Sequence, residues 1–224
     1  MDKRPMALPI AKEGYPFIIP TAMATLLFVS LGWVYFTGIF CVITFFVISF
    51  FRNPTRTIPS SEGGIVSPAD GKILEIERHL ENHLLNRETV KISIFMSLFN
   101  VHVNRSPITG RVMKKVYRPG KFFAANTDKS SLLNERNVLL LCSRDGFEVL
   151  FIQIAGIIAR RIVCYPQKGD LLKKGQVFGM IRFCSRVEIY LPPSVDIRVR
   201  VGDRVKAGKT ILGYRNGKKT KGRY

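Results

Sequence analysis

The sequence predicts a mainly β protein that carries an apolar helical hairpin at its N-terminus. Residues 14–51 contain no Asp, Glu, Lys, Arg or His, which is typical of helices that are buried in a membrane or in a protein core. After residue 64, short runs rich in Val, Ile and Phe alternate with glycine turns. Their spacing is that of an all-β sandwich or barrel.

Residues 1–51 are predicted to form a membrane anchor. A bilayer-spanning helix needs about 20 apolar residues, so the uncharged stretch suffices for a transmembrane or re-entrant helical hairpin, with Thr37-Gly38 as the expected break. Trp33 and Tyr35 are aromatic residues of the kind found near membrane interfaces. Basic residues on both flanks place both termini, and the domain that follows, on the cytoplasmic side of the cell membrane. The alternative is a buried core helix.

The net charge favours a lipid partner. The chain has 35 Lys and Arg residues against 16 Asp and Glu residues, a formal net charge of +19. On electrostatics alone this surface suits nucleic acid or anionic lipid. No helix-turn-helix, zinc-finger or aromatic RNA-binding signature is present, so we expect an anionic membrane surface and no nucleic acid. Four cysteines without C-x-x-C spacing and only three histidines predict no metal site and no disulfide.

A linker, residues 52–64, precedes a β-rich domain, residues 65–224. About ten strands are predicted in this domain from the apolar runs and their turns. Helical patterning is scarce. The runs are residues 64–77, 89–103, 108–117, 137–143, 147–156, 160–166, 177–183, 185–192, 195–201 and 209–214.

The β-rich domain contains an internal repeat. Residues 168–181, "KGDLLKKGQVFGMI", resemble residues 201–214, "VGDRVKAGKTILGY", and each copy has a Gly-Asp pair followed by a second glycine. Glycine supplies a positive φ at such turns without steric cost. These turns resemble those of biotinyl and lipoyl carrier domains, which implies a barrel-sandwich-hybrid-like fold and says nothing of chemistry.

Three residues are candidates for chemistry, and each has an ordinary alternative. Asp70 lies in a strong Asp-Gly turn signal and could serve as a turn former. His102 lies in a strand-like run on the same face as Asn104, where a histidine is usually structural. Ser185 lies between two apolar runs and could be a bulge or edge serine. Together, however, an Asp, a His and a Ser are the parts of an activated nucleophile.

The motifs around these residues resemble the phosphatidylserine decarboxylase proenzymes, in particular the short membrane-anchored form of bacteria and archaea. The similarity covers nearly the whole chain and keeps the family's order. The motifs are "FFRNP", "VSPADGKI", "FNVHVNRSPITG", "NERN", "QIAGIIARRIV" and "FGMIRFCSRVEIYLP".

The resemblance implies a self-processing enzyme. The bond between residues 184 and 185 would be cut by Ser185, with His102 as the base and Asp70 orienting it, and Ser185 would become an N-terminal pyruvoyl group. The cleavage products, residues 1–184 and 185–224, would stay together as a heterodimer. Phosphatidylserine or archaetidylserine would form a Schiff base with the pyruvoyl group and lose carbon dioxide, without pyridoxal phosphate or metal. His102 is the candidate that reprotonates the substrate carbon.

Two positions depart from the family pattern. Cys184 stands where the family has glycine before the serine, and a side chain there restricts the backbone at the cleavage site. Arg105 stands where longer family members have a second histidine, so no role is assigned to it. Two alternatives therefore stay open, a processing-deficient inactive homologue and a membrane-anchored adaptor of barrel-sandwich type.

Overall fold

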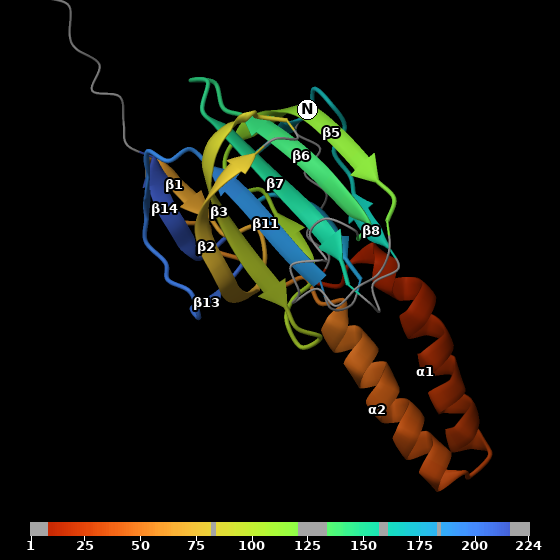
Figure 1. The fold of residues 1–224 in the computed structure, drawn as a ribbon. Coiled ribbons are helices and arrows are strands. Elements are labelled where there is room, and N and C mark those ends of the chain that lie inside the picture. Colours follow the sequence, from red (N-terminus) through yellow and green to blue (C-terminus); the bar gives the residue numbers. More distant parts are fainter. Residues whose placement is uncertain (1–8, 82–83, 121–133, 157–160, 183–184, 216–224) are drawn as a thin grey trace, which may run out of the picture.

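The computed structural model describes residues 9–81, 84–120, 134–156, 161–182 and 185–215. Within these ranges, a helical hairpin precedes fourteen β-strands (Figure 1). The prediction of a mainly β protein is confirmed. The closer assignment to a barrel-sandwich hybrid stays a prediction.

Two apolar helices project from the β domain as a hairpin (Figure 1). After a 3-10 turn at Lys12–Gly14, α1 (Tyr15–Ser30) begins with a proline in its first turn, where a missing N–H group costs little. α2 (Val34–Phe50) returns toward the domain. The break lies at Gly32, whose φ of 70° suits glycine. The predicted break at Thr37-Gly38 is wrong, because both residues lie inside α2.

The transmembrane form of the anchor prediction is not supported. In the part of the chain that the structure describes, no helix combines the length and apolar character needed to cross a membrane. α1 has 16 residues and α2 has 17. At 1.5 Å per residue, each helix is about 25 Å long, whereas a bilayer's hydrocarbon core is about 30 Å thick.

The strands that follow form three antiparallel sheets. The largest has the order β13-β2-β3-β11-β7-β6-β5-β9, and it curls over two smaller sheets, β1-β14-β12 and β4-β10-β8 (Figure 1). The strand bounds are β1 Gly64–Val66, β2 Gly71–Glu81, β3 Arg87–Met96, β4 Val103–Arg105, β5 Gly110–Arg118, β6 Arg136–Cys142, β7 Glu148–Ala155, β8 Ile162–Cys164, β9 Leu171–Leu172, β10 Val177–Ile181, β11 Ser185–Leu191, β12 Val195–Ile197, β13 Arg204–Val205 and β14 Ile211–Arg215.

All ten predicted apolar runs contain a strand. The first run divides into β1 and β2, and the second divides into β3 and β4, because a turn interrupts each run. The two-residue strands β9 and β13 were not predicted. The apolar side chains of all three sheets meet in one buried core between them, which includes Phe151 and Phe178.

The internal repeat of the sequence is also a repeat of structure. Gly169 and Gly202 both have a φ of 95°. The carboxylate of the next residue, Asp170 or Asp203, accepts a hydrogen bond of 2.8 Å from the N–H group three residues earlier. β9 and β13 follow these turns and form the two edges of the large sheet.

The strand pairings extend this repeat to two halves of the domain. The inserted half is contiguous, from β4 to β10, and the outer half consists of β1–β3 and β11–β14. From one edge of the large sheet, the first four strands come from the outer half. From the other edge, the first four come from the inserted half, and they correspond one to one in the same order. The corresponding strands are β1 and β4, β2 and β5, β3 and β6, β11 and β7, β12 and β8, β13 and β9, and β14 and β10.

The position of Ser185 follows from this arrangement. In the inserted half, β6 and β7 are joined by a tight turn at residues 143–147. In the outer half, the corresponding strands β3 and β11 are separated in sequence by the whole inserted half. β3 ends at Met96, β11 begins at Ser185, and these two residues pair across the strands. Ser185 is therefore the first described residue after the chain returns to the outer half.

Candidate active site

Ser185 is fully buried in the middle of the large sheet. It pairs with Met96 on β3 and with Ala155 on β7. β11 has a neighbour on each side, so the edge-serine alternative is wrong. The Ser185 hydroxyl donates to the Met96 sulfur at 3.5 Å. A thioether is a weak acceptor, which leaves this hydroxyl group only weakly held.

His102 is fully buried directly before β4. Its ring lies over the ring of Phe50, with 4.1 Å between the centroids. Nδ1 lies 3.0 Å from the carbonyl oxygen of Asn100, which can only accept, so Nδ1 carries the proton. Nε2 is then the basic nitrogen, and it is buried without a hydrogen-bond partner in the described part of the chain.

The charge state of His102 suits a base. Burial lowers the pKa of His102 from its ordinary value of 6.5 to about 4, the Asn100 hydrogen bond opposes this shift, and the Arg52 guanidinium contributes to it. The imidazole is therefore neutral at pH 7 and has a free lone pair on Nε2.

This lowered pKa predicts a pH-dependent stability. Between pH 6.5 and 4 the unfolded chain binds a proton at residue 102 that the folded chain does not bind, so the free energy of unfolding falls as the pH falls through this window. We expect a loss of about 2 kcal/mol between pH 7 and pH 5. Urea unfolding at the two pH values measures it.

The matched variants for this measurement are His102→Gln and His79→Gln, since the side chain of His79 is 41% exposed. His102→Gln should remove most of the pH dependence, and His79→Gln should keep it. An equal pH dependence in wild type and His102→Gln would contradict the assignment.

Asp70 lies in the turn before β2, and both of its carboxylate oxygens have partners. Oδ1 accepts from the N–H group of Ala207 at 2.7 Å, and Oδ2 pairs with Arg56 at 2.8 Å. In the inserted half, Thr109 occupies the corresponding position, and its Oγ1 accepts from the N–H group of Lys174 at 3.0 Å. The Oδ1 bond therefore belongs to the repeated turn, which favours the turn-forming role for Asp70.

The three predicted residues lie around β4, but in the described ranges no hydrogen bond joins any two of them. The N–H group of Arg105 donates to the carbonyl of Pro68 at 2.9 Å and holds the Asp70 turn against β4. Asn104 Nδ2 approaches the Met96 sulfur at 3.7 Å, the same atom that the serine contacts. The orienting role of Asp70 therefore stays a prediction.

Sequence reasoning missed a group of buried amides beside the serine. Asn104, Gln153 and Asn137 are at most 2% exposed, and they bond to one another through their side chains. A signal for them was present, because Gln153 interrupts the apolar run "FEVLFIQIAG" at a core-facing position. The sequence places Asn104 and Gln153 far apart, so their contact could not be inferred from it.

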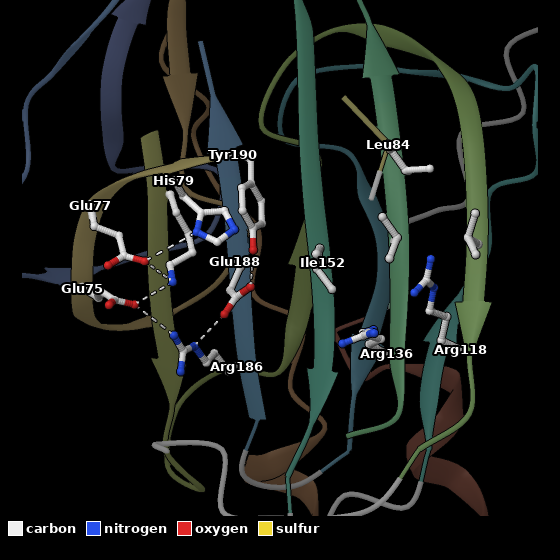
Figure 2. Close-up of a pocket in the computed structure, with 13 residues that line it drawn as sticks. Glu75, Glu77, His79, Leu84, Arg118, Arg136, Ile152, Arg186, Glu188 and Tyr190 are labelled. Carbon is white, nitrogen blue, oxygen red and sulfur yellow. Dashed lines mark hydrogen bonds and ion pairs between the residues drawn. The ribbon is translucent and has the colours of Figure 1, made fainter. Parts of the chain in front are cut away.

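The cavity of about 340 Å³ in Figure 2 lies on the face of the large sheet opposite to the one that carries the Ser185 side chain. None of the three predicted residues lines it. Its connection to the site is Arg186, whose side chain is 3% exposed and approaches Glu188 at 3.1 Å and Glu75 at 3.2 Å. Arg186 also donates to Ser93 at 2.7 Å. This buried ion cluster fixes the residue that directly follows Ser185.

Two further predictions concern residues near the site. Arg105 donates to Asn53 and to the carbonyls of Pro54 and Gly175, so it holds the linker on the domain. Cys184 lies outside the described residues. Within those residues, no cluster of three or more His, Cys, Asp or Glu side chains could hold a metal ion.

Comparison with known proteins identifies relatives that match most of the chain. A family model described as phosphatidylserine decarboxylase matches residues 43–213. The chain is 48% identical over 205 residues to the phosphatidylserine decarboxylase proenzyme of Geotalea uraniireducens, covering 92% of this chain and 96% of the relative. It is 50% identical over 206 residues to the protein of the same name from Syntrophotalea carbinolica, with 92% and 96% covered.

Proposed function

The chain belongs to the phosphatidylserine decarboxylase family, and we propose that it decarboxylates a serine phospholipid through a pyruvoyl group formed from Ser185. This membership favours the enzyme over the membrane-anchored adaptor. The observation that carries the proposal is the buried hydroxyl of Ser185, the first residue of β11, which among the described residues bonds only to a thioether. Phosphatidylserine and archaetidylserine share the headgroup that reacts, so both are candidate substrates.

The surroundings of Ser185 fit such a group. A pyruvoyl group supplies a carbonyl that takes up the substrate amine and an electron sink for the pair released with carbon dioxide. The strands on both sides of β11 hold residue 185 in the sheet through its pairing with Met96 and Ala155. Arg186 anchors the next residue from the opposite face.

His102 is the base of this proposal. With Nδ1 bonded to the Asn100 carbonyl and the pKa lowered to about 4, Nε2 is free to accept the Ser185 proton at neutral pH. The same nitrogen returns a proton to the substrate carbon after decarboxylation. Asp70 contributes through the turn that it holds against Ala207, two residues after β13, and against Arg56.

Activity on a defined substrate tests the proposal. Purified protein in detergent should release carbon dioxide from phosphatidylserine without added pyridoxal phosphate or metal, and it should release none from phosphatidylcholine, which has no carboxylate. Hydroxylamine captures carbonyl groups, so it should abolish the activity. Full activity after hydroxylamine treatment would contradict the pyruvoyl mechanism, and release that depends on pyridoxal phosphate would contradict it equally.

We also propose that the helical hairpin attaches the enzyme to the cytoplasmic face of the cell membrane. α1 and α2 expose large apolar side chains along their length, and an apolar surface of this extent is typical of a membrane or partner contact. The chain's net charge of +19 would draw it to anionic lipid. Helices of this length suit insertion into part of the bilayer, where the lipid headgroup can reach the domain.

Charge introduced on the hairpin tests this attachment. Leu26 and Val42 are 68% and 70% exposed, and the double variant Leu26→Lys/Val42→Lys should lose most of its binding to vesicles of phosphatidylglycerol and phosphatidylethanolamine in a flotation assay. Leu80→Lys on the β domain, where Leu80 is 55% exposed, should bind like wild type. Deleting the hairpin is a less suitable test, because the deletion would also remove Phe50, whose ring packs on the ring of His102. Unchanged flotation of the double variant would refute the attachment.

A further inference from the structure

Three buried amide side chains form a chain of hydrogen bonds that ends beside Ser185. Asn137 Nδ2 donates to Gln153 Oε1 at 3.2 Å, and Gln153 Nε2 donates to Asn104 Oδ1 at 2.9 Å. Asn104 Nδ2 then approaches the Met96 sulfur at 3.7 Å. The Ser185 hydroxyl approaches the same sulfur from β11 at 3.5 Å.

A backbone carbonyl sets the direction of this amide chain. The carbonyl oxygen of Val163 lies 3.4 Å from Gln153 Nε2, and because it can only accept, the Gln153 NH₂ group faces it. The same NH₂ group donates to Asn104 Oδ1, so the Asn104 NH₂ group is the one directed at Met96. A thioether is a weak acceptor. Asn104 therefore presents a strong donor that is free to bond a better acceptor.

The outer half of the domain shows that the fold does not need these amides. The strand registers assign each amide an apolar counterpart at the corresponding position: Ile65 for Asn104, Leu191 for Gln153 and Val90 for Asn137. Ile65 and Leu191 are buried in the core, and the partly buried Val90 packs against it. Buried polar groups cost stability unless they are hydrogen-bonded. Amides at these positions in one half alone indicate a role other than packing.

We propose that the amide chain holds Asn104 as the hydrogen-bond donor that stabilises the negative charge formed on oxygen when Ser185 reacts. The inference rests on the proposed function, because it assigns a residue to the self-cleavage step. Asn104, which shares the Met96 sulfur with the Ser185 hydroxyl, is the proposed donor, and Gln153 and Asn137 are positioning residues. The Met96 sulfur is the resting acceptor for both donors.

The negative charge that this donor would stabilise forms on the carbonyl oxygen of residue 184. Ser185 Oγ gives its proton to the base and forms a bond to the carbonyl carbon of residue 184, and the carbonyl electron pair moves onto its oxygen. The carbon–nitrogen bond then breaks, the nitrogen takes up a proton, and an ester remains. No electrons are gained or lost overall. A fixed donor favours the charged state of this step over the uncharged start.

Replacing the three amides by their apolar counterparts from the outer half distinguishes a role in cleavage from a role in packing. The triple substitution Asn104→Ile, Gln153→Leu and Asn137→Val removes all three amides at once, so no amide is left without its amide partner. We expect a folded protein that cleaves about 100-fold more slowly than wild type. Cleavage is followed by intact mass and gel after cell-free synthesis. Folding is followed by thermal unfolding of the same triple substitution combined with Ser185→Ala, against Ser185→Ala alone.

A second variant tests the direction of the amide chain. In Gln153→Glu the new carboxyl group can donate to Asn104 Oδ1 only when it is protonated, and burial raises the pKa of such a group. Cleavage should therefore be at least tenfold faster at pH 5.5 than at pH 8, whereas wild type should cleave at similar rates because His102 is neutral at both. A purely structural role would give no such pH profile.

The outcomes separate the two proposals. Slow cleavage of a folded triple variant, together with the acid-dependent Gln153→Glu profile, supports the inference. If wild type cleaves and the triple variant cleaves as fast, the inference is wrong while the proposed function stands. If the triple variant does not fold, a pH-independent Gln153→Glu rate equal to that of wild type overturns it. A wild-type chain that never cleaves overturns the proposed function and this inference together.

Discussion

Replacing Ser185 by alanine is expected to leave a single chain of 25.4 kDa with no decarboxylase activity. The alanine has no oxygen with which to attack the preceding carbonyl, so neither the cleavage nor the pyruvoyl group can form. Wild type should separate under denaturing conditions into residues 1–184 and 185–224. The smaller fragment should have a blocked N-terminus and the mass of a chain whose first residue carries a carbonyl in place of its amine.

Ser93→Ala is the matched control for this variant. Ser93 is also fully buried in the large sheet, but its hydroxyl bonds to the ion cluster of Arg186 on the other face. In Ser93→Ala, Arg186 keeps its ion pairs with Glu75 and Glu188, so cleavage should stay intact. A Ser185→Ala chain that still cleaves at the same bond would refute the role of Ser185.

Cys184 is expected to limit the rate of the proposed cleavage. Glycine reaches strained backbone conformations that a residue with Cβ reaches at a cost of about 1–3 kcal/mol, so Cys184→Gly should cleave faster than wild type. An intact wild type beside a cleaving Cys184→Gly variant would identify the chain as the processing-deficient homologue. Equal rates would mean that an ordinary residue is accommodated at this position.

Replacing His102 by alanine should slow self-cleavage by about 10²–10⁴-fold, the usual contribution of a positioned base. Its Nε2 is buried and has no partner among the described residues, and its pKa of about 4 keeps it neutral. The remaining described histidine, His79, is exposed near Glu77. His79→Ala should cleave at the rate of wild type, as judged by the same mass measurement.

Added imidazole distinguishes a catalytic from a structural loss in this variant. The removed ring leaves space beneath Phe50, and imidazole that enters it can accept the serine proton. Partial recovery of cleavage in a His102→Ala chain of near-normal thermal stability supports the base. A variant that is folded and cleaves at the normal rate without imidazole would rule His102 out.

The β architecture could be predicted from the sequence because its signals are local. Apolar runs bounded by glycine turns located the strands, and the two Gly-Asp turns revealed the repeat. The hairpin break was placed wrongly, because Thr37-Gly38 and Gly32 offer similar local signals and helix packing decides between them. The split of the domain into an inserted and an outer half depends on strand pairing, which the sequence does not display.

The candidate site was only partly predictable. Ser185 and His102 were found as unusual residues in apolar runs, but their partners come from distant strands, Met96 for the serine and Phe50 for the histidine. The oxygens of Asp70 bond to Ala207 and Arg56, partners that the sequence did not indicate, and its role in orienting His102 stays a prediction. Such contacts depend on tertiary packing, which residue type and spacing leave undetermined.

The central position of β11 in the large sheet affects how long a cleaved enzyme molecule stays active. β11 lies between β3 and β7, and β14 is the middle strand of a smaller sheet, so the fragment that the proposed cleavage would produce from residue 185 onward completes two sheets. The uncut chain folds in a unimolecular reaction, whereas two separate fragments would have to find each other at a rate that depends on their concentration. A cleaved molecule that unfolds at the low concentration of the fragments in a cell would seldom refold. Its working lifetime would then be set by the rate at which the sheet opens.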